Sequence, residues 1–168
     1  LAAWAWAAKA NGNDEVKTKQ FIADLYRNVP VLDTGARGST TTFAQRGLGD
    51  VFISWENEAF LVLQEFGADN FEIVVPSLSI KAEPPVALVD ENAKAKGTTK
   101  VAEAYLNFLY SPAGQKLAAK HFFRPSDPSA ADPADLARFP KLDLVSIDSD
   151  FGGWTEAQQK HFADGGVF

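Results

Sequence analysis

Two glycine turns that bracket a short helical stretch set the strongest constraint on how this 168-residue chain can fold. Residues 31–57 read VLDTGARGSTTTFAQRGLGDVFISWEN. The pattern predicts a strand, a permissive turn over 35–38, a helix ended by Gly47, and a second strand over 51–53. Ser39 to Thr42 supply hydroxyl groups that we expect to cap this helix. A strand, a helix and a strand in succession are typical of an α/β fold.

The same stretch has the features of an anion-binding site. Small residues over 35–38 let backbone amides approach a ligand, and a helix start leaves N–H groups without partners. Trp55 follows the second strand, at the carboxyl end where open α/β sheets bind ligands. Its indole N–H can only donate a hydrogen bond, which suits a fully ionised oxyanion. An ordinary connection with a core tryptophan explains the same spacing, so both interpretations stay open here.

Composition narrows the classes of function. The sequence is 46% hydrophobic and 23% charged, as in a folded globular protein. A net charge of −6 argues against a nucleic-acid-binding surface, and any anion must be held by local dipoles. The absence of Cys excludes disulfides, thiolate metal sites and cysteine catalysis. No apolar run approaches the roughly 18 residues that a membrane span needs.

Candidate catalytic and metal-ligating residues are few. His121 and His161 lie far apart in the sequence without a partner at metal-ligand spacing, so we expect both to be solvated. Glu56 and Glu58 diverge if their segment is helical, which favours a solvated face or a structural ion pair. The hydroxyls of 39–42 lack a neighbouring base. The sequence therefore predicts no enzyme, no metal and no cofactor.

Periodicity predicts several further elements. An amphipathic helix is expected over 98–110, and Ser111 with Pro112 indicates the cap and first residue of another helix. An apolar run predicts a strand over 71–75, and alternating apolar and polar residues predict another over 142–147. Trp4 and Trp6 cannot both face one stripe of a helix, so we expect one of them at an interface.

Five blocks of this sequence resemble the sulfate-binding proteins of the periplasm, the receptors of sulfate/thiosulfate ABC importers. They are GARG, GLGDVFISWENEA, PSLSIKAEPPVALVD, YLNFLYSPAGQKLAAKHFFRP and FGGWTEAQQKHFADGG, and the similarity as a whole extends over nearly all of the chain. The resemblance implies a type II periplasmic-binding-protein fold and a periplasmic location. It also implies that the backbone amide of Ala36 and the indole N–H of Trp55 donate to sulfate. Arg37 matches an arginine that supports the site from behind, and the helix that begins near Gly38 is expected to contribute its N-terminal amides.

The resemblance also implies that the chain is the later portion of a two-lobed receptor whose first half is missing. We expect an anion-binding lobe portion over 1–76, a hinge crossover over 77–90, and a portion of the other lobe with the C-terminal region over 91–168. The expected partners are sulfate or thiosulfate, the membrane permease of the importer and the missing N-terminal half, with no nucleic acid. Asp33 and Glu56 are expected to point away from the anion.

Three alternatives stay open beside this interpretation. The chain could be a related oxyanion-binding or effector-sensing domain, or an incomplete fragment with little binding of its own. An enzyme built on the same fold would need an acid, base or nucleophile near Trp55, and a regulator would need a DNA-binding helix pair. The sequence offers neither feature.

Overall fold

The computed structural model describes all of residues 1–168 and divides the chain into two compact units. Unit 1 comprises residues 1–52, 74–83 and 141–168, and unit 2 comprises residues 53–73 and 84–140. The chain therefore passes between the units at four places. The domain boundaries expected from the sequence, at residues 76 and 90, stay a prediction.

Unit 1 contains seven helical elements, which lie near its two ends in sequence, and one small sheet. Its helices and helical turns are α1 (Ala2–Ala10), α2 (Glu15–Arg27), α3 (Ala36–Thr40) with the π-helical turn η1 (Thr41–Gln45), and α9 (Ile147–Phe151) and α10 (Gly153–Ala157) with the π-helical turn η3 (Gln158–Phe162). Asp14 starts α2, because its side chain accepts a hydrogen bond from the amide of Lys17 at 3.1 Å. Trp4 is buried, whereas Trp6 is 41% exposed, so the two indoles do face different surroundings.

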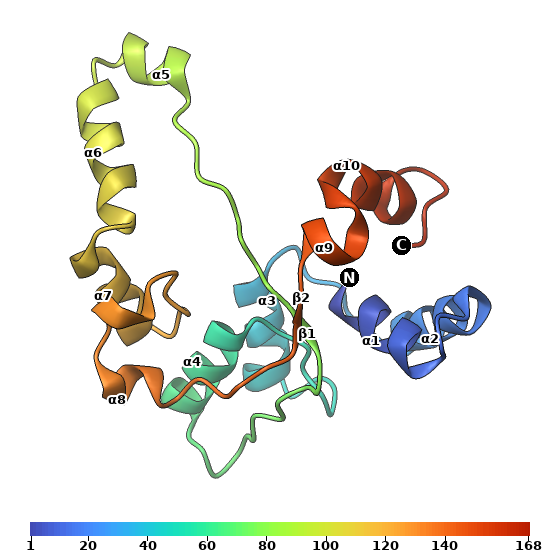
Figure 1. Cartoon of the computed structure of the whole chain (residues 1–168). Helices are drawn as coiled ribbons and strands as arrows, with labels where there is room; N and C mark the ends of the chain where they lie inside the picture. Colours follow the sequence, from blue (N-terminus) through green and yellow to red (C-terminus); the bar gives the residue numbers. More distant parts are fainter. The chain divides into compact units, whose positions relative to one another are not determined.

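The sheet of unit 1 consists of two short parallel strands, β1 (Ser79–Ile80) and β2 (Leu144–Val145), which lie side by side in Figure 1. Ser79 pairs with Leu144 and Ile80 with Val145. The strands are hydrogen-bonded from the amide of Ser79 to the Asp143 carbonyl and from Lys81 to the Val145 carbonyl, both at 2.9 Å. β2 confirms part of the strand expected over 142–147.

Unit 2 is helical. It contains α4 (Glu56–Phe66), α5 (Asp90–Ala95), α6 (Thr99–Leu109), α7 (Pro112–Lys120), the 3₁₀ turn η2 (Pro128–Ala130) and α8 (Pro133–Leu136). Ser111 caps α7 by accepting from the amide of Gly114 at 3.2 Å, and Pro112 occupies the first position, as expected. Gly114 has no room for a side chain, because an added Cβ would lie 2.2 Å from the Phe108 carbonyl oxygen.

Three strands expected from apolar runs are wrong: residues 31–33, 51–53 and 71–75 have no strand in the structure. A strand requires a hydrogen-bonded neighbour, and the only sheet is β1 with β2. The runs keep their apolar side chains largely exposed, with Leu32 73%, Val51 81% and Val74 81% accessible. Exposed apolar residues of this kind are typical of surface that another strand or chain covers.

No helix in the structure is both long and apolar enough to cross a membrane.

Candidate functional site

The predicted amide donors begin helix α3 in unit 1. Gly35 is its N-cap residue, with extended backbone at φ −174° and ψ 163°, and Ala36 is the first helical residue. No side chain caps this end of the helix. The first intrahelical bond runs from the amide of Ser39 to the Gly35 carbonyl at 3.0 Å. The amide of Ala36 therefore belongs to the first turn, whose N–H groups have no partner within the helix.

The hydroxyl groups over 39–42 do not cap the helix, contrary to expectation. Helix α3 begins three residues before Ser39, so Ser39 and Thr40 lie inside it, and Thr41 and Thr42 lie in the following turn η1. The hydroxyls of Ser39, Thr40 and Thr41 instead donate back to carbonyls four residues earlier, at 3.3, 3.0 and 3.1 Å. This local bonding is the common alternative for Ser and Thr within a helix. It leaves the first amides of α3 without help from those side chains.

Arg37 and Gly38 lie in the first turn of α3, which begins two residues before Gly38. The Asp33 side chain lies alongside this turn, with its Cβ 3.5 Å and its Oδ1 3.7 Å from the position that a Cβ on Gly38 would take. Arg37 is exposed to solvent at its place in the turn. The supporting role of Arg37 and the direction of Asp33 relative to an anion stay predictions.

The predicted indole donor begins helix α4 in unit 2. Trp55 is the N-cap residue of α4, with extended backbone at φ −64° and ψ 144°, and its carbonyl accepts from the amide of Ala59 at 3.1 Å. Trp55 is 58% exposed, so it is not a core residue of unit 2. An exposed ring at a helix start can present its N–H to a ligand.

A bidentate ion pair fixes the first residue of α4. Arg124 donates from Nε to Oε2 of Glu56 at 2.6 Å and from Nη2 to Oε1 at 2.7 Å. Arg124 Nη2 also donates to the Pro140 carbonyl at 2.8 Å, and its guanidinium lies 5.2 Å from the centre of the Phe139 ring. The structural ion pair expected for Glu56 is confirmed, although its partner lies 68 residues away and was not identified from the sequence.

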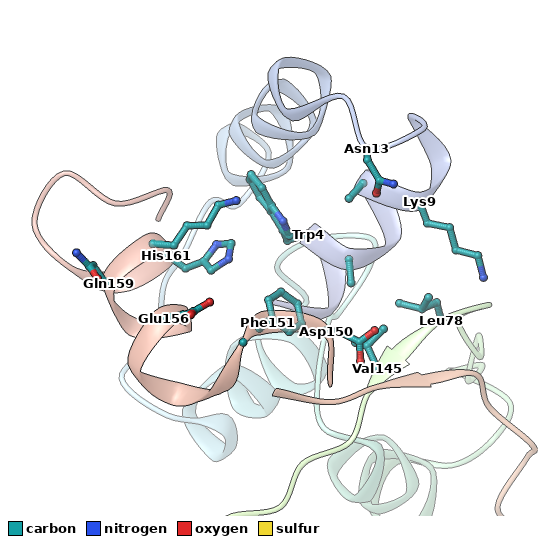
Figure 2. Close-up of a pocket in the computed structure, with 14 residues that line it drawn as sticks. Trp4, Lys9, Asn13, Leu78, Val145, Asp150, Phe151, Glu156, Gln159 and His161 are labelled. Atoms are coloured by element: carbon teal, nitrogen blue, oxygen red, sulfur yellow. The ribbon is translucent and has the colours of Figure 1, made fainter. Parts of the chain in front are cut away.

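Unit 1 also contains a cavity of about 800 Å³ that the sequence did not predict. Figure 2 shows Trp4, Phe151 and His161 around it, with ring centres of Trp4 and His161 5.0 Å apart and of Phe151 and His161 5.7 Å apart. Lys9, Lys160, Asp150 and Glu156 add charged groups to its wall. None of the predicted sulfate-binding residues lines this cavity.

The expectation that His161 is solvated is wrong, since the residue is only 2% exposed. Its Nδ1 is buried without a hydrogen-bond partner. Burial lowers the pKa of His161 below its ordinary value, and the positive charges of Lys160 and of the amino terminus add to that effect, with Glu15 opposing it. The sequence signal for this position is Ala157, a small apolar residue four positions earlier. It lies on the same helix face as His161 and is also buried. His121 is exposed, as expected.

The described residues contain no group of three or more His, Asp or Glu side chains that could hold a metal ion. The donors that the structure offers at α3 and α4 are a backbone amide and an indole N–H. Donors of this kind bind an anion by hydrogen bonds and local dipoles.

Comparison with known proteins gives one family and several relatives. The family model described as bacterial extracellular solute-binding protein matches residues 1–124. The sulfate-binding protein of Escherichia coli is 58% identical over 168 residues, which are all of this chain and 51% of that protein. The thiosulfate-binding protein of Pseudomonas aeruginosa is 50% identical over 169 residues, which are all of this chain and 50% of that protein.

Among solved structures, the sulfate-binding protein SubI from Mycobacterium tuberculosis aligns with a TM-score of 0.78 and 33% identity, over 97% of this chain and 54% of that one. This likeness confirms the predicted periplasmic-binding-protein fold for the part that the chain spans. The chain spans about half the length of the curated relatives it matches.

Proposed function

The chain belongs to the family of bacterial extracellular solute-binding proteins, and from that premise we propose that it is part of a receptor that binds sulfate for delivery to an ABC importer. The observation that carries this proposal is the 58% identity, over the whole chain, to a protein named for sulfate binding. Thiosulfate is the second candidate ligand, because a thiosulfate-binding relative is 50% identical over the same span.

In this proposal the Ala36 amide and the Trp55 indole N–H both donate to the bound anion. Ala36 begins α3 without a side-chain cap, and Trp55 is exposed at the start of α4, so each donor has the local setting that the role requires. Hydrogen bonds to an ionised acceptor are roughly twice as strong as neutral ones. Gly38 contributes its backbone amide from the first turn of α3, and Arg37 supports that turn.

A dianion held only by N–H donors keeps its charge without a touching countercharge. Hydrogen-bond dipoles spread the charge over the donors, and exclusion of water strengthens each bond. Because the net charge is −6, the protein does not attract an anion at long range. The affinity therefore depends on the short-range N–H donors. The further partners are the permease of the importer and a polypeptide equivalent to the remaining half of the relatives, and the proposed location is the periplasm.

Calorimetric titration with sulfate tests this proposal. We compare the 168-residue chain with a chimaera in which it is joined to the remaining half of the E. coli relative. The chimaera is expected to bind sulfate. The chain alone is expected to bind more than about tenfold more weakly, because each charged hydrogen bond it lacks costs about that factor. Failure of the chimaera to bind sulfate or thiosulfate would contradict the proposed function.

A further inference from the structure

We infer that Arg124 is a positioning residue for Trp55, and that it also keeps the Glu56 carboxylate from acting on the anion. The inference deepens the proposed function and rests on it for the role of Trp55. The observation that carries it is the Arg124–Glu56 bridge within unit 2, at 2.6 and 2.7 Å, immediately beside the proposed indole donor.

The bridge is built more firmly than a typical surface ion pair. Both carboxylate oxygens of Glu56 accept from separate N–H groups of one planar guanidinium, the geometry that only Arg provides. A third bond, from Nη2 to the Pro140 carbonyl at 2.8 Å, fixes the same guanidinium from another segment. The Phe139 ring lies 5.2 Å away and completes its surroundings. The two side chains are only 36% and 28% exposed, so solvent screens the pair less than an open one.

Fixing Glu56 fixes the backbone that carries the indole. Glu56 is the first residue of α4 and is bonded directly to Trp55, whose carbonyl accepts the first bond of the helix from Ala59. No side chain caps this helix end. The bridge to Arg124 therefore supplies the restraint that a cap supplies elsewhere, and it lowers the freedom that the indole loses when it binds a ligand.

The bridge also offsets the negative charge of Glu56 beside the proposed donor. An unpaired carboxylate one residue from Trp55 repels a dianion, and it can accept the O–H of a protonated anion such as phosphate. With its charge offset by the guanidinium and each oxygen already accepting from Arg124, Glu56 repels a dianion less and is a weaker acceptor for that O–H. The same pair thus serves affinity for sulfate and rejection of phosphate.

Unit 2 provides a matched control. Arg138 lies on the same aromatic cluster as Arg124, with its guanidinium 4.9 Å from the Phe122 ring, and it pairs with Asp135. The rings of Phe60 and Phe122 stack at 5.4 Å, and that of Phe139 meets Phe60 at 6.0 Å, so both arginines cover one packed group. Arg138→Gln removes an arginine of the same kind without touching Glu56.

The experiment measures sulfate affinity by calorimetry and phosphate competition at pH 7 in the chimaera, for Arg124→Gln, Arg138→Gln and the double variant Glu56→Leu/Arg124→Gln. Arg124→Gln is expected to weaken sulfate binding about tenfold, the effect of one charged hydrogen bond, and to make phosphate a better competitor. Arg138→Gln is expected to change neither quantity. The double variant is expected to regain most of the phosphate rejection, because the unpaired carboxylate is gone.

A purely structural role predicts a different result. If Arg124→Gln lowers the melting temperature but leaves sulfate affinity and phosphate competition like those of Arg138→Gln, the inference is overturned. Loss of affinity without rescue of selectivity in the double variant overturns the part that concerns Glu56.

Amide hydrogen exchange in the 168-residue chain separates this inference from the proposed function. Faster exchange at the first turn of α4 in Arg124→Gln than in Arg138→Gln supports the positioning role, even if the unaltered chimaera binds no sulfate. Equal exchange in the two variants overturns that role whatever the chimaera binds.

Discussion

The two segments that carry the proposed donors are built in different ways. In unit 1, Ala36 offers a backbone amide at a helix start that follows a glycine, and no side chain caps it. In unit 2, Trp55 offers a side-chain donor at a helix start whose first residue is held by Arg124 at 2.6 Å. A backbone donor is fixed by the helix itself, whereas an indole depends on the packing of its neighbours.

This difference predicts how each segment responds to substitution. The amide at position 36 survives a change of side chain, so sequence at that position is constrained only by helix geometry. Substitution of Trp55 removes the indole donor, and substitution of the residues that hold Trp55 displaces it.

The largest expected effect is the rejection of phosphate. Sulfate carries no proton near neutral pH, so donors alone satisfy it, whereas phosphate brings an O–H that needs an acceptor. We expect the chimaera to favour sulfate by roughly 10⁴–10⁵, as sites matched to one hydrogen-bond pattern do. Competition of phosphate against labelled sulfate measures the ratio.

Asp33 is the carboxylate that this measurement examines most closely, because its side chain lies against the first turn of α3. Phosphate that competes at concentrations comparable to sulfate shows that a carboxylate faces the anion. If Asp33→Asn then abolishes the competition, Asp33 is that acceptor and the prediction that it points away is wrong.

The next effect concerns the indole. Trp55→Phe keeps an aromatic ring and deletes the N–H, which is worth roughly 1.5–3 kcal/mol toward a charged acceptor. We expect sulfate affinity to fall about ten- to a hundredfold in the chimaera, with little change in melting temperature without ligand. Calorimetry measures the affinity and differential scanning calorimetry the stability.

Trp154 is the matched control, since it is 58% exposed, as Trp55 is, and has no proposed role. Trp154→Phe should leave sulfate affinity unchanged. If both variants bind like the unaltered protein, Trp55 is a surface residue and not a donor.

Ala36 provides the backbone counterpart of that test. Ala36→Pro deletes the amide N–H at the first helical position, where proline fits, and the extended Gly35 before it is compatible with a following proline. We expect a loss in affinity of about tenfold. Ala36→Ser keeps the amide and should bind within about a factor of two, since Ala36 is only half-buried and substitutions outside the core change free energies by about 0.5 kcal/mol or less. Equal losses in the two variants would mean that the side chain, and not the amide, matters.

The elements that the sequence predicts well are those decided by local chemistry. The caps Asp14 and Ser111 and the amphipathic periodicity of α6 depend only on residues a few positions apart. The strands over 31–33, 51–53 and 71–75 were wrong because a strand depends on a neighbour that no local pattern supplies. The hydroxyls over 39–42 were misassigned because the helix begins earlier than its capping residues suggested.

The candidate site divides in the same way. Ala36 and Trp55 came from the resemblance to a family, and their roles stay predictions. The Arg124–Glu56 bridge joins residues 68 positions apart, so no spacing rule could find it. The burial of His161 is not predicted because it depends in part on Trp4, which lies near the other end of the sequence.

The smallest expected effect is a pH dependence confined to unit 1. Because burial lowers the pKa of His161, the unfolded chain binds a proton as pH falls below the ordinary value of 6.5 while the folded chain does not. The free energy of unfolding is therefore highest above that pH and decreases as pH falls toward the lowered pKa. His161→Phe should remove this part of the decrease. Denaturant unfolding at pH values about one unit apart, between pH 7.5 and 5.5, measures the free energy of unfolding. An unchanged slope in His161→Phe assigns the dependence to other groups.

The most direct test of the two-donor account is a sulfate titration of the isotopically labelled chimaera followed by ¹⁵N–¹H correlation spectra. The account predicts that the Trp55 indole N–H and the Ala36 amide both shift downfield with one common dissociation constant, while the Trp154 indole does not move. Binding of sulfate that leaves the Trp55 and Ala36 resonances unchanged would contradict the account.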